Sequence, residues 1–561
     1  MKKKLFFGLT TLVVALTAVG VSACKEEDPP KGCGAFEEYV EYVLNEDGNS
    51  YEIQMFTPKE IQDYQSYEEF LSENNHITAI TGELIIPATY NGKPVTKVGA
   101  YAFASCSITS VILPDSIRSI GFSAFSGCEN LMTVTLGTDL QKIGFGAFED
   151  CYRLVEIYNK SSLEITATST EHGEIGAHAK EVYTDDYQTK LATDADGYVT
   201  YTFGEEKSLV NYLGGRFSVY IPEGVTEINA YALAGFDEIT NVSLPASLQV
   251  INENAFYGCN DLANVYVPSV EAWCNIAFTD YNASPFNYAY RMYVDDDLVV
   301  ALTIPDGITS LNEYAFYSIE SITSVSIPQT LTEIENNAFA WCVNLENVQF
   351  PQTLIRIGEY AFTGCKKLKT VTLPNGLERI EKSAFSHSGL TRIELPNSLQ
   401  TLGEGAFNSC ANLAEASLGN TLVYLNRETF LDCEKLERVT IGNSIKSIGP
   451  FAFANCFALA EISFPQALEQ IGESAFFSCF ALTELIILDK TNYIGTGAFE
   501  YCEALERIAI GSGLKNVEAY AFYGCGALSE VYYNGTEEDF TRIVVGGNNE
   551  PFLNATVYYA E

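Results

Sequence analysis

A hydrophobic pattern that returns at intervals of about 23 residues organises most of this chain. Each copy ends in an Ala-Phe dipeptide or a close variant of it. The second residue of this dipeptide occupies fifteen positions: Phe103, Phe125, Phe148, Leu233, Phe256, Phe316, Phe339, Phe362, Phe385, Phe407, Phe430, Phe453, Phe476, Phe499 and Phe522. A fixed period in this range is typical of a solenoid, in which each copy packs only on its neighbours.

One copy shows which elements the pattern predicts. The alternation from Val371 to Leu373 predicts a short strand with one buried face. Pro374 ends the strand, because proline lacks the N–H that a strand ladder needs. Leu377 and Ile380 predict an opposite apolar wall, and Phe385 fills the space between. We therefore predict a mainly β repeat solenoid with rungs of about 22–23 residues, short parallel strands, capped ends and two insertions.

Written as a template, the copy reads L-x-x-V-x-L-P-x-x-L-x-x-I-x-x-x-A-F-x-x-C. This template resembles the BspA-type (Treponema-like) leucine-rich repeat of bacterial surface proteins, over residues 84–533 apart from the two insertions. The resemblance implies a leucine-rich repeat fold. It also implies an association with adhesion to host matrix proteins, host cells or other bacteria.

The places where the period fails suggest a domain organisation. Copies leave the template after Tyr158, Tyr266 and Tyr532. We divide the chain into a lipoprotein signal peptide (1–23), a tether (24–33), an N-terminal cap (34–82), repeat block 1 (83–158), an insertion (159–218), block 2 (219–265), a cap-like insertion (266–297), block 3 (298–530) and a C-terminal cap (531–561).

Two of these segments resemble one another when they are aligned at a fixed offset. Val265-Tyr266 corresponds to Val531-Tyr532, and Pro285-Phe286 corresponds to Pro551-Phe552. We interpret both as cap-like units that shield an open end of the solenoid. A binding excursion at 266–297 is the alternative.

Two further segments carry hairpin signals. In the N-terminal cap, Asn45 to Gly48 separates two strand-like stretches. In the 159–218 insertion, Asp194 to Gly197 reads D-x-D-G, which is also how a calcium loop begins. Because the later calcium ligands are missing, we predict a hairpin turn there.

The N-terminus has the features of an export signal. Lys2 to Lys4 is basic, Leu5 to Val19 is apolar, and small residues precede Cys24. Val21-Ser22-Ala23-Cys24 resembles the lipobox of bacterial lipoproteins, which implies that Cys24 is lipidated and anchors the chain to the membrane on the cell surface. A plain secretory signal with an incidental cysteine is the alternative.

The net charge of −41 argues against one class of partner. Nucleic-acid binding needs basic residues gathered against phosphates, and no such cluster occurs here. The expected partner is therefore a protein or glycan ligand, together with the membrane, and no nucleic acid.

Twelve of the fifteen cysteines follow the dipeptide by three residues: Cys106, Cys128, Cys151, Cys259, Cys342, Cys365, Cys410, Cys433, Cys456, Cys479, Cys502 and Cys525. Export permits disulfides, and the rung spacing does not forbid them. The same position also accepts Phe236, Ile319 and Ser388, however, and no C-x-x-C pair suggests zinc. We interpret these thiols as small buried hydrophobes.

Catalytic motifs do not stand out from the sequence. The four histidines, His76, His172, His178 and His387, lack partners at metal or nucleophile spacing. There is no G-x-S-x-G and no P-loop. A glycosidase pair could lie among the many carboxylates, but a solenoid rung offers no obvious site to raise a carboxylate pKa. We predict no enzyme, no metal and no cofactor.

Two rows of outward strand positions, with one residue from each rung, are the candidate binding surface in block 3. The first row alternates in charge through Arg392, Glu415, Arg438 and Glu461, which we interpret as avoidance of repulsion between rungs. The second row is a candidate docking strip that turns apolar towards its end: Gln349, Thr372, Glu394, Ser417, Thr440, Ser463, Ile486, Ala509 and Tyr532. An ordinary solvated surface is the alternative for both.

Three functions follow from these features. The first is a surface-anchored, adhesin-like binding protein. The second is a glycan- or peptide-capturing lipoprotein, or a hydrolase accessory, that acts through residues 159–218. The third is a structural spacer without a specific ligand.

Overall fold

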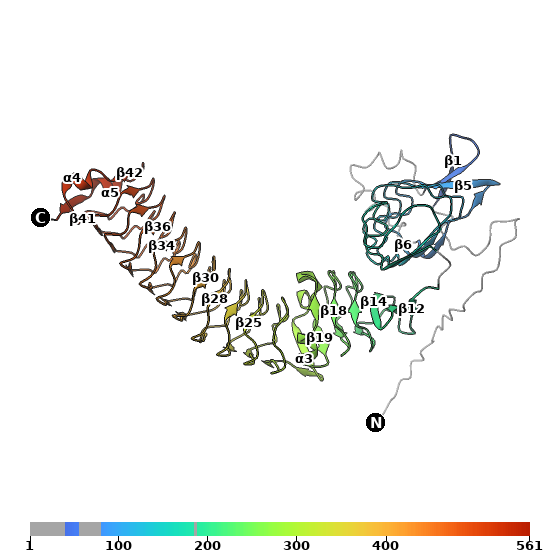
Figure 1. Ribbon diagram of the computed structural model, residues 1–561, viewed down its shortest axis with the longest axis horizontal. Helices are drawn as coiled ribbons and strands as arrows, with labels where there is room; N and C mark the ends of the chain where they lie inside the picture. Colours follow the sequence, from blue (N-terminus) through green and yellow to red (C-terminus); the bar gives the residue numbers. More distant parts are fainter. Residues whose placement is uncertain (1–39, 55–79, 185–187, 561) are drawn as a thin grey trace, which may run out of the picture. The chain divides into compact units, whose positions relative to one another are not determined.

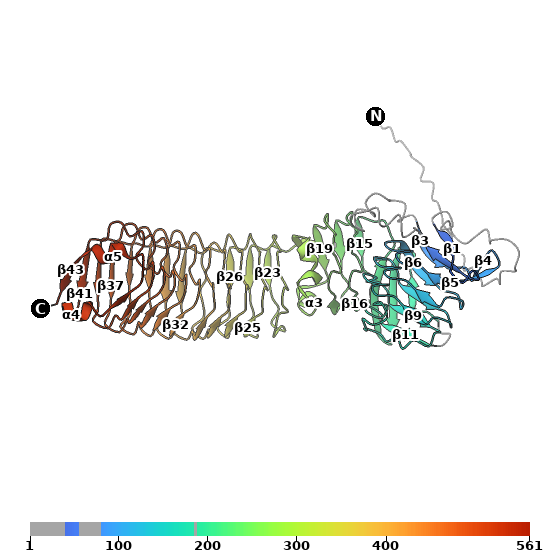
Figure 2. The same ribbon diagram turned by 90° about the horizontal axis from the view of Figure 1, so that it is seen from above.

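The structure is a computed structural model of the chain, and it describes residues 40–54, 80–184 and 188–560. The chain forms two compact units, Met1–Tyr187 and Gln188–Glu561. The signal peptide at 1–23, the tether at 24–33 and the predicted lipidation site Cys24 lie outside the described residues. In both units, short strands stack one rung upon the next, as Figures 1 and 2 show. The predicted mainly β repeat solenoid is confirmed.

Each rung contributes up to two strands, which belong to two separate columns. The first column holds the predicted V-x-L strand. In most rungs the second column holds a two-residue strand where the sequence predicts only an apolar wall. In the first unit, the first column is a parallel sheet of β3 (Thr81–Ile85), β6 (Ser107–Ile112), β8 (Thr133–Leu136), β10 (Glu156–Asn159) and β11 (Glu181–Tyr183).

The second column of the first unit begins with an antiparallel hairpin, as predicted from Asn45 to Gly48. Its strands are β1 (Glu41–Leu44), β2 (Tyr51–Gln54), β5 (Lys93–Val98), β7 (Ser119–Ile120) and β9 (Lys142–Ile143), with β4 (Thr89–Tyr90) antiparallel to β5. From β2 onwards the stacked neighbours are parallel.

In the second unit, the first column is divided into four sheets. They are β15 (Ser218–Tyr220), β17 (Asn241–Ser243), β19 (Asn264–Val267), β21 (Arg291–Val294) and β22 (Asp297–Leu298); β23 (Ala301–Thr303), β24 (Ser324–Ser326) and β26 (Asn347–Gln349); β29 (Arg392–Leu395), β31 (Glu415–Leu418), β33 (Arg438–Thr440) and β35 (Glu461–Ser463); and β37 (Glu484–Ile487), β39 (Arg507–Ile510), β41 (Glu530–Tyr533) and β43 (Thr556–Tyr559).

The second column of this unit opens with an antiparallel meander and continues as parallel two-residue strands. The sheets are β12 (Leu191–Thr193), β13 (Tyr198–Phe203), β14 (Glu206–Tyr212), β16 (Glu227–Ile228), β18 (Val250–Ile251) and β20 (Ala277–Phe278); β25 (Glu333–Ile334), β27 (Arg356–Ile357), β28 (Arg379–Ile380) and β30 (Thr401–Leu402); and β32 (Tyr424–Leu425), β34 (Ser447–Ile448), β36 (Gln470–Ile471), β38 (Tyr493–Ile494), β40 (Asn516–Val517) and β42 (Val544–Val545).

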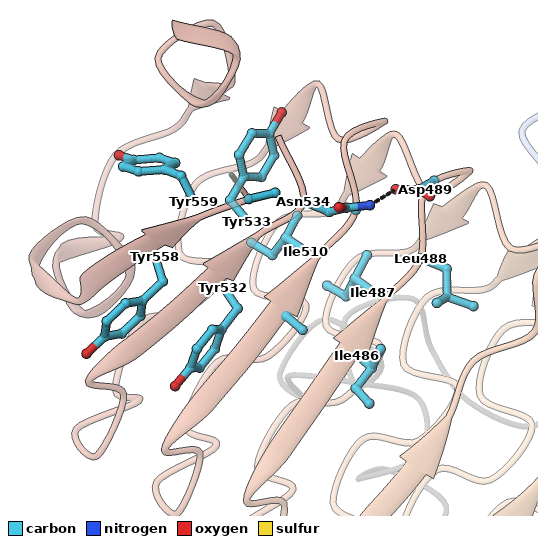
Figure 3. Close-up of a pocket in the computed structure, with 13 residues that line it drawn as sticks. Ile486, Ile487, Leu488, Asp489, Ile510, Tyr532, Tyr533, Asn534, Tyr558 and Tyr559 are labelled. Atoms are coloured by element: carbon cyan, nitrogen blue, oxygen red, sulfur yellow. Dashed lines mark hydrogen bonds between the residues drawn. The ribbon is translucent and has the colours of Figure 1, made fainter. Parts of the chain in front are cut away.

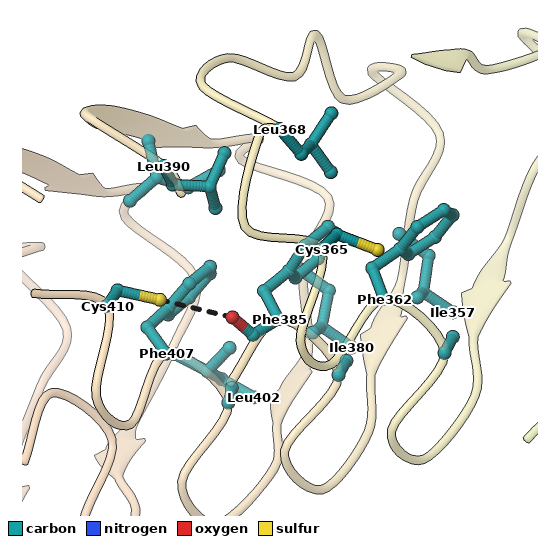
Figure 4. Packing of buried hydrophobic residues seen from close by; sticks show 14 of the residues in the cluster. Ile357, Phe362, Cys365, Leu368, Ile380, Phe385, Leu390, Leu402, Phe407 and Cys410 are labelled. Carbon is teal, nitrogen blue, oxygen red and sulfur yellow. Dashed lines mark hydrogen bonds between the residues drawn. The ribbon is translucent and has the colours of Figure 1, made fainter. Parts of the chain in front are cut away.

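The periodic phenylalanines form the core between the columns. From Phe316 to Phe552, successive rings stack with centroids 5.1 to 5.7 Å apart. Figure 4 shows three of these rings with the leucines and isoleucines that enclose them. Since a lone rung would leave its ring exposed, stacking is a condition of folding.

The periodic cysteines join this core through a weak hydrogen bond. The thiol of Cys410 donates to the carbonyl of Phe385 in the preceding rung at 3.1 Å, as Figure 4 shows. In block 3 all eight of these thiols are buried and form no disulfide: Cys342, Cys365, Cys410, Cys433, Cys456, Cys479, Cys502 and Cys525. Burial raises the pKa of Cys342 to about 12. These side chains are small buried hydrophobes, as predicted.

Residues 159–218, which the sequence presents as one insertion, are shared between the two units. Strand β11 extends the first-column sheet of the first unit by pairing with β10. Strands β12 to β14 begin the second unit, and β14 pairs with β16. The turn at Asp194 to Gly197 connects antiparallel strands, as predicted. Asp194 accepts the N–H groups of Asp196 and Tyr198, both at 3.0 Å.

The two segments that resemble one another in sequence also fold alike. The internal segment contains α3 (Val270–Cys274), η3 (Tyr281–Ala283) and η4 (Pro285–Asn287) between β19 and β21. The terminal segment contains α4 (Glu537–Phe540) and α5 (Glu550–Asn554) between β41 and β43. We call them the internal and the terminal closing rung.

One expectation for the internal closing rung needs correction. The sequence predicts that residues 266–297 shield an open end of the solenoid. Instead, one hydrophobic core runs through them, from Tyr198 in β13 to Phe552 in α5. The indole of Trp273 is fully buried and donates to the carbonyl of Ala315 in the following rung at 2.6 Å. This closing rung therefore joins two parts of one unit.

Candidate functional site

The predicted docking strip lies on the outer side of the first column. All nine residues are exposed or half-buried, and all except Thr372 lie in strands. They do not form the one continuous ladder that the sequence predicted: residues 370–373 form no strand between β26 and β29, and β35 and β37 belong to separate sheets. The first interruption coincides with a turn that is one residue shorter, from Phe385 to Leu390. In that turn, a Cβ on Gly389 would lie 2.1 Å from the carbonyl oxygen of Lys366.

The neighbouring row of charged strand positions forms ion pairs between rungs. Arg438 contacts Glu415 at 2.5 Å, and Arg507 approaches Glu484 at 3.8 Å. These pairs are exposed, so each contributes little to stability. They support the interpretation that the alternation prevents repulsion between stacked rungs.

The apolar end of the strip is a distinct surface. Ile486, Tyr532 and Tyr558 are 52%, 43% and 46% exposed. The rings of Tyr532 and Tyr558 stack with centroids 4.9 Å apart and an interplanar angle of 16°. Figure 3 shows these two rings and Ile486 on one side of the sheet, with Tyr533 and Ile510 on the other. We call Ile486, Ala509, Tyr532 and Tyr558 the C-terminal strip.

A hollow of ≈ 390 Å³ follows the same strands and adds polar groups to the strip. Asn534 donates to Asp489 at 3.2 Å, and the backbone N–H of Ser512 donates to the same carboxylate at 2.9 Å. These two hydrogen bonds, that of Ser512 first, hold the pKa of Asp489 below its ordinary value. The hollow thus combines an apolar side with one fixed negative charge.

Tyr532 keeps its phenolic proton. Its hydroxyl donates to Glu530 at 3.1 Å, and this bond raises the pKa of Tyr532. The strip therefore offers ring faces and a hydrogen-bonding hydroxyl at neutral pH.

The other candidate functional side chains, the histidines among them, do not gather into a site within the described residues. No group of three or more His, Cys, Asp or Glu side chains there could hold a metal ion. His178 lies edge-on to Tyr152, with centroids 5.4 Å apart. His76 lies outside the described residues. Within residues 40–54, 80–184 and 188–560, no helix is long and apolar enough to cross a bilayer.

The repeat matches a known family over most of its length. A family model described as the BspA type leucine rich repeat region matches residues 93–170, 216–288, 287–414, 332–458 and 423–544, with six copies. The chain belongs to this family.

Solved structures of several bacterial proteins resemble this chain at low identity. A leucine rich cell surface protein from Faecalibacterium prausnitzii is 24% identical with a TM-score of 0.41, and the match covers 64% of this chain and 98% of that one. A leucine-rich repeat protein from Bacteroides ovatus is 19% identical with a TM-score of 0.39, covering 93% and 98%. The pneumococcal vaccine antigen PcpA is 16% identical with a TM-score of 0.37, covering 67% and 100%. No curated protein matches the chain.

The sequence interpretation missed Tyr558, which lies outside the BspA-type template. Strand β43 pairs with β41 in register, so that Tyr558 lies opposite Tyr532. The other two exit tyrosines are matched in the same way, Tyr158 by Tyr183 and Tyr266 by Tyr293. The signal was therefore present, because each exit tyrosine is followed by a second tyrosine slightly more than one repeat later.

Proposed function

We propose that this protein is a lipid-anchored protein of the bacterial cell surface that binds a protein ligand in an adhesin-like manner. The family, the lipobox-like sequence at Cys24 and the predicted export signal support the surface location. The extended outer side of the strands supports binding, because it offers a long accessible surface.

The observation that carries the proposal is the C-terminal strip. Soluble proteins rarely expose contiguous large apolar groups, and such patches usually mark interaction sites. Tyrosine is also enriched where proteins bind one another, since its ring is apolar and its hydroxyl forms hydrogen bonds. Here Tyr532 and Tyr558 stack beside Ile486, and Asp489 adds a negative charge at the edge.

The test is a binding screen of the purified chain against extracellular matrix proteins, host cells and other bacteria, followed by two variants. Ile486→Glu and Tyr532→Glu place charge on exposed positions and should not disturb the core. We expect each to weaken binding to the captured protein by about tenfold or more, as for a central interface residue.

Thr440→Glu and Ser463→Glu are the matched controls. Both lie in the same outward row of the docking strip but outside the C-terminal strip, and both are exposed. They should leave the affinity unchanged. Equal affinities for all four variants would remove the strip from the binding surface, and a screen without any captured protein would contradict the proposed function.

A further inference from the structure

A second hollow, of ≈ 480 Å³, lies in the second unit at the turns that carry the periodic phenylalanines. It extends from the internal closing rung across the rungs of Phe316, Phe339, Phe362, Phe385 and Phe407. Its lining includes Tyr281, Tyr314, Tyr317, Trp341, Thr363 and Ser386. None of them belongs to the docking strip.

The hollow exists because one repeat position is small in consecutive rungs. This floor position directly follows the core phenylalanine. It holds Ala340, Thr363 and Ser386, which are at most 6% exposed. Elsewhere the same position holds larger side chains, such as Leu431, Phe477 and Tyr523, or small ones in runs of at most two, such as Ala454. Three small residues stacked in consecutive rungs therefore leave the space that forms the hollow.

Aromatic side chains stand around this floor in fixed positions. Tyr281, Tyr314 and Tyr317 form a cluster with centroids 6.0 to 6.1 Å apart. Trp341 is 40% exposed, and its six-membered ring lies against the backbone of Gly364, where a Cβ would be 2.6 Å from its Cε3. Glycine at 364 thus makes room for the indole.

The backbone beneath these side chains is held by a ladder of its own. The N–H of Trp341 donates to Thr363 O at 2.7 Å, and the N–H of His387 donates to Asn408 O at 2.8 Å. The rim residues Tyr314, Trp341 and Tyr360 have φ of 63°, 62° and 56°. Because rims at the other rungs share this left-handed backbone, it is a property of the repeat that presents the side chains outward.

The chemistry of the lining is neutral. No Asp, Glu, Lys or Arg occurs among the described residues that form the hollow, although such residues make up 19% of the chain. Hydroxyls, amides and one imidazole supply the polar groups. Burial raises the pKa of Tyr314 and of Tyr317, so both phenols remain protonated donors.

We propose that this hollow binds an extended, uncharged oligosaccharide. Pyranose rings carry apolar C–H faces that pack on aromatic rings, and hydroxyl edges that need neutral hydrogen-bonding groups; the hollow offers both. Its volume lies within the range of small-ligand sites. The core rings along it are 5.3 to 5.7 Å apart, which is close to the length that one pyranose unit adds to an extended chain.

Other ligand classes fit less well. Single-stranded nucleic acids stack on aromatic rings but need a positively charged groove, and acidic glycans would be repelled by a chain of net charge −41. A protein ligand typically inserts an apolar anchor into a dry pocket, whereas this floor is lined by Thr363, whose hydroxyl donates to the carbonyl of Ser386 at 3.0 Å, and by Ser386 itself. The neutral sugar is the class that uses both the rings and the polar floor.

The experiment probes the purified full chain with an array of neutral hexose and N-acetylhexosamine oligosaccharides, from monosaccharides to hexamers, with sialylated and sulfated glycans beside them. Calorimetry then measures the affinity of the bound neutral oligosaccharides. We expect affinity to rise with length over the first few units, and Trp341→Ala to weaken binding by about tenfold or more, as for an aromatic stacking platform. Ser386→Phe should also abolish binding by filling the floor.

Each variant has a control at the same repeat position. Tyr501 also lies against a glycine of the next rung, Gly524, so Tyr501→Ala matches Trp341→Ala outside the hollow. Ala454→Phe matches Ser386→Phe, and Phe477 shows that the repeat tolerates this residue there. Both controls should bind like the wild-type chain, as should Tyr532→Glu in the docking strip. Thermal unfolding checks that all variants fold.

Three results would overturn the proposal. One is the absence of binding to any neutral oligosaccharide. Another is unchanged affinity in both Trp341→Ala and Ser386→Phe, or an equal loss in the control variants. The third is a captured protein that loses binding in Trp341→Ala while no sugar binds, which would assign the hollow to a protein ligand.

Discussion

The internal and the terminal closing rungs are built alike, yet they meet different surroundings. In both, a short helix follows the exit strand and its N-cap side chain accepts a backbone N–H: Ser269 from Ala272, and Thr536 from Asp539. Trp273 and Phe540 are each the fourth residue after the cap. Trp273 packs edge-on against Phe286, with centroids 5.2 Å apart, and Phe540 packs against Phe552 at 6.0 Å.

The two rungs differ in what the helix offers to the next rung. Trp273 is fully buried and its indole N–H bonds to Ala315 in the next rung. Phe540 is half-buried and has no polar group, and no rung follows it among the described residues. The same supersecondary unit therefore carries a ring that donates a hydrogen bond to the next rung in one copy, and a ring without a polar group in the other.

Trp273→Ala should show the largest effect, because it leaves a cavity in the continuous core and an unpaired carbonyl at Ala315. We expect a loss of roughly 3–5 kcal/mol. Chemical denaturation followed by hydrogen exchange should show residues 188–297 and 301–560 opening separately. Phe540→Ala is the control, with a smaller loss confined to the last rung. A single shared transition with unchanged midpoint would contradict the role of Trp273 as a junction.

Trp273→Phe removes the indole N–H but keeps an aromatic ring, so it leaves a smaller gap in the core than Trp273→Ala. It gives the internal rung the residue of the terminal one and leaves the carbonyl of Ala315 without its donor. A buried carbonyl that loses its partner costs about 1–3 kcal/mol. Equilibrium unfolding measures this difference. If the variant were as stable as the wild-type chain, packing alone would join the two parts.

Alkaline pH should weaken the internal rung through Cys274. Burial raises the pKa of this thiol to about 12, from an ordinary value of 9.0. Below pH 9 the thiol is protonated in the folded and the unfolded chain, and its contribution is fully present. Between pH 9 and 12 only the unfolded chain releases the proton, so the free energy of unfolding falls, by at most about 1.4 kcal/mol per pH unit.

Cys274→Ala should therefore lose stability less steeply than the wild-type chain between pH 9 and 10.5, as measured by denaturant unfolding at each pH. The other thiols titrate in both proteins, so their effect cancels in the difference. Thr541 follows Phe540 as Cys274 follows Trp273, and it carries no group that titrates in this range. Thr541→Ala should leave the slope unchanged, and an unchanged slope in Cys274→Ala would refute the assignment.

The sequence is sufficient to predict those structural features that depend only on one rung and the rung next to it. The stacked phenylalanines, the buried thiols and the likeness of the two closing rungs all follow from the period. The Cys position, for example, needs only a small apolar side chain that can reach a carbonyl of the preceding rung.

Features that depend on how several rungs meet were not predicted. The gap in the strand ladder at residues 370–373 accompanies one missing residue in the next turn, which the template hides. The second hollow arises only when Ala340, Thr363 and Ser386 are stacked and Gly364 admits the indole of Trp341. The left-handed backbone that presents this surface is marked only in part by residue type: Gly, Ser, Asp and Asn often occupy these turn positions, but Tyr and Trp adopt the same conformation.

The hydrogen bonds of the Ala-Phe turns also determine how this protein can change its length over evolutionary time. The N–H of Phe430 bonds to Ala452, and that of Phe453 bonds to Ala475, in each case one repeat ahead. Unequal recombination that removes or duplicates a whole repeat restores the same partners at the new seam. The two hollows, at Trp341 and at Tyr532, are separated by such repeats. Adding or removing one repeat between the two hollows therefore changes the distance between them by about 4.8 Å and leaves both surfaces intact.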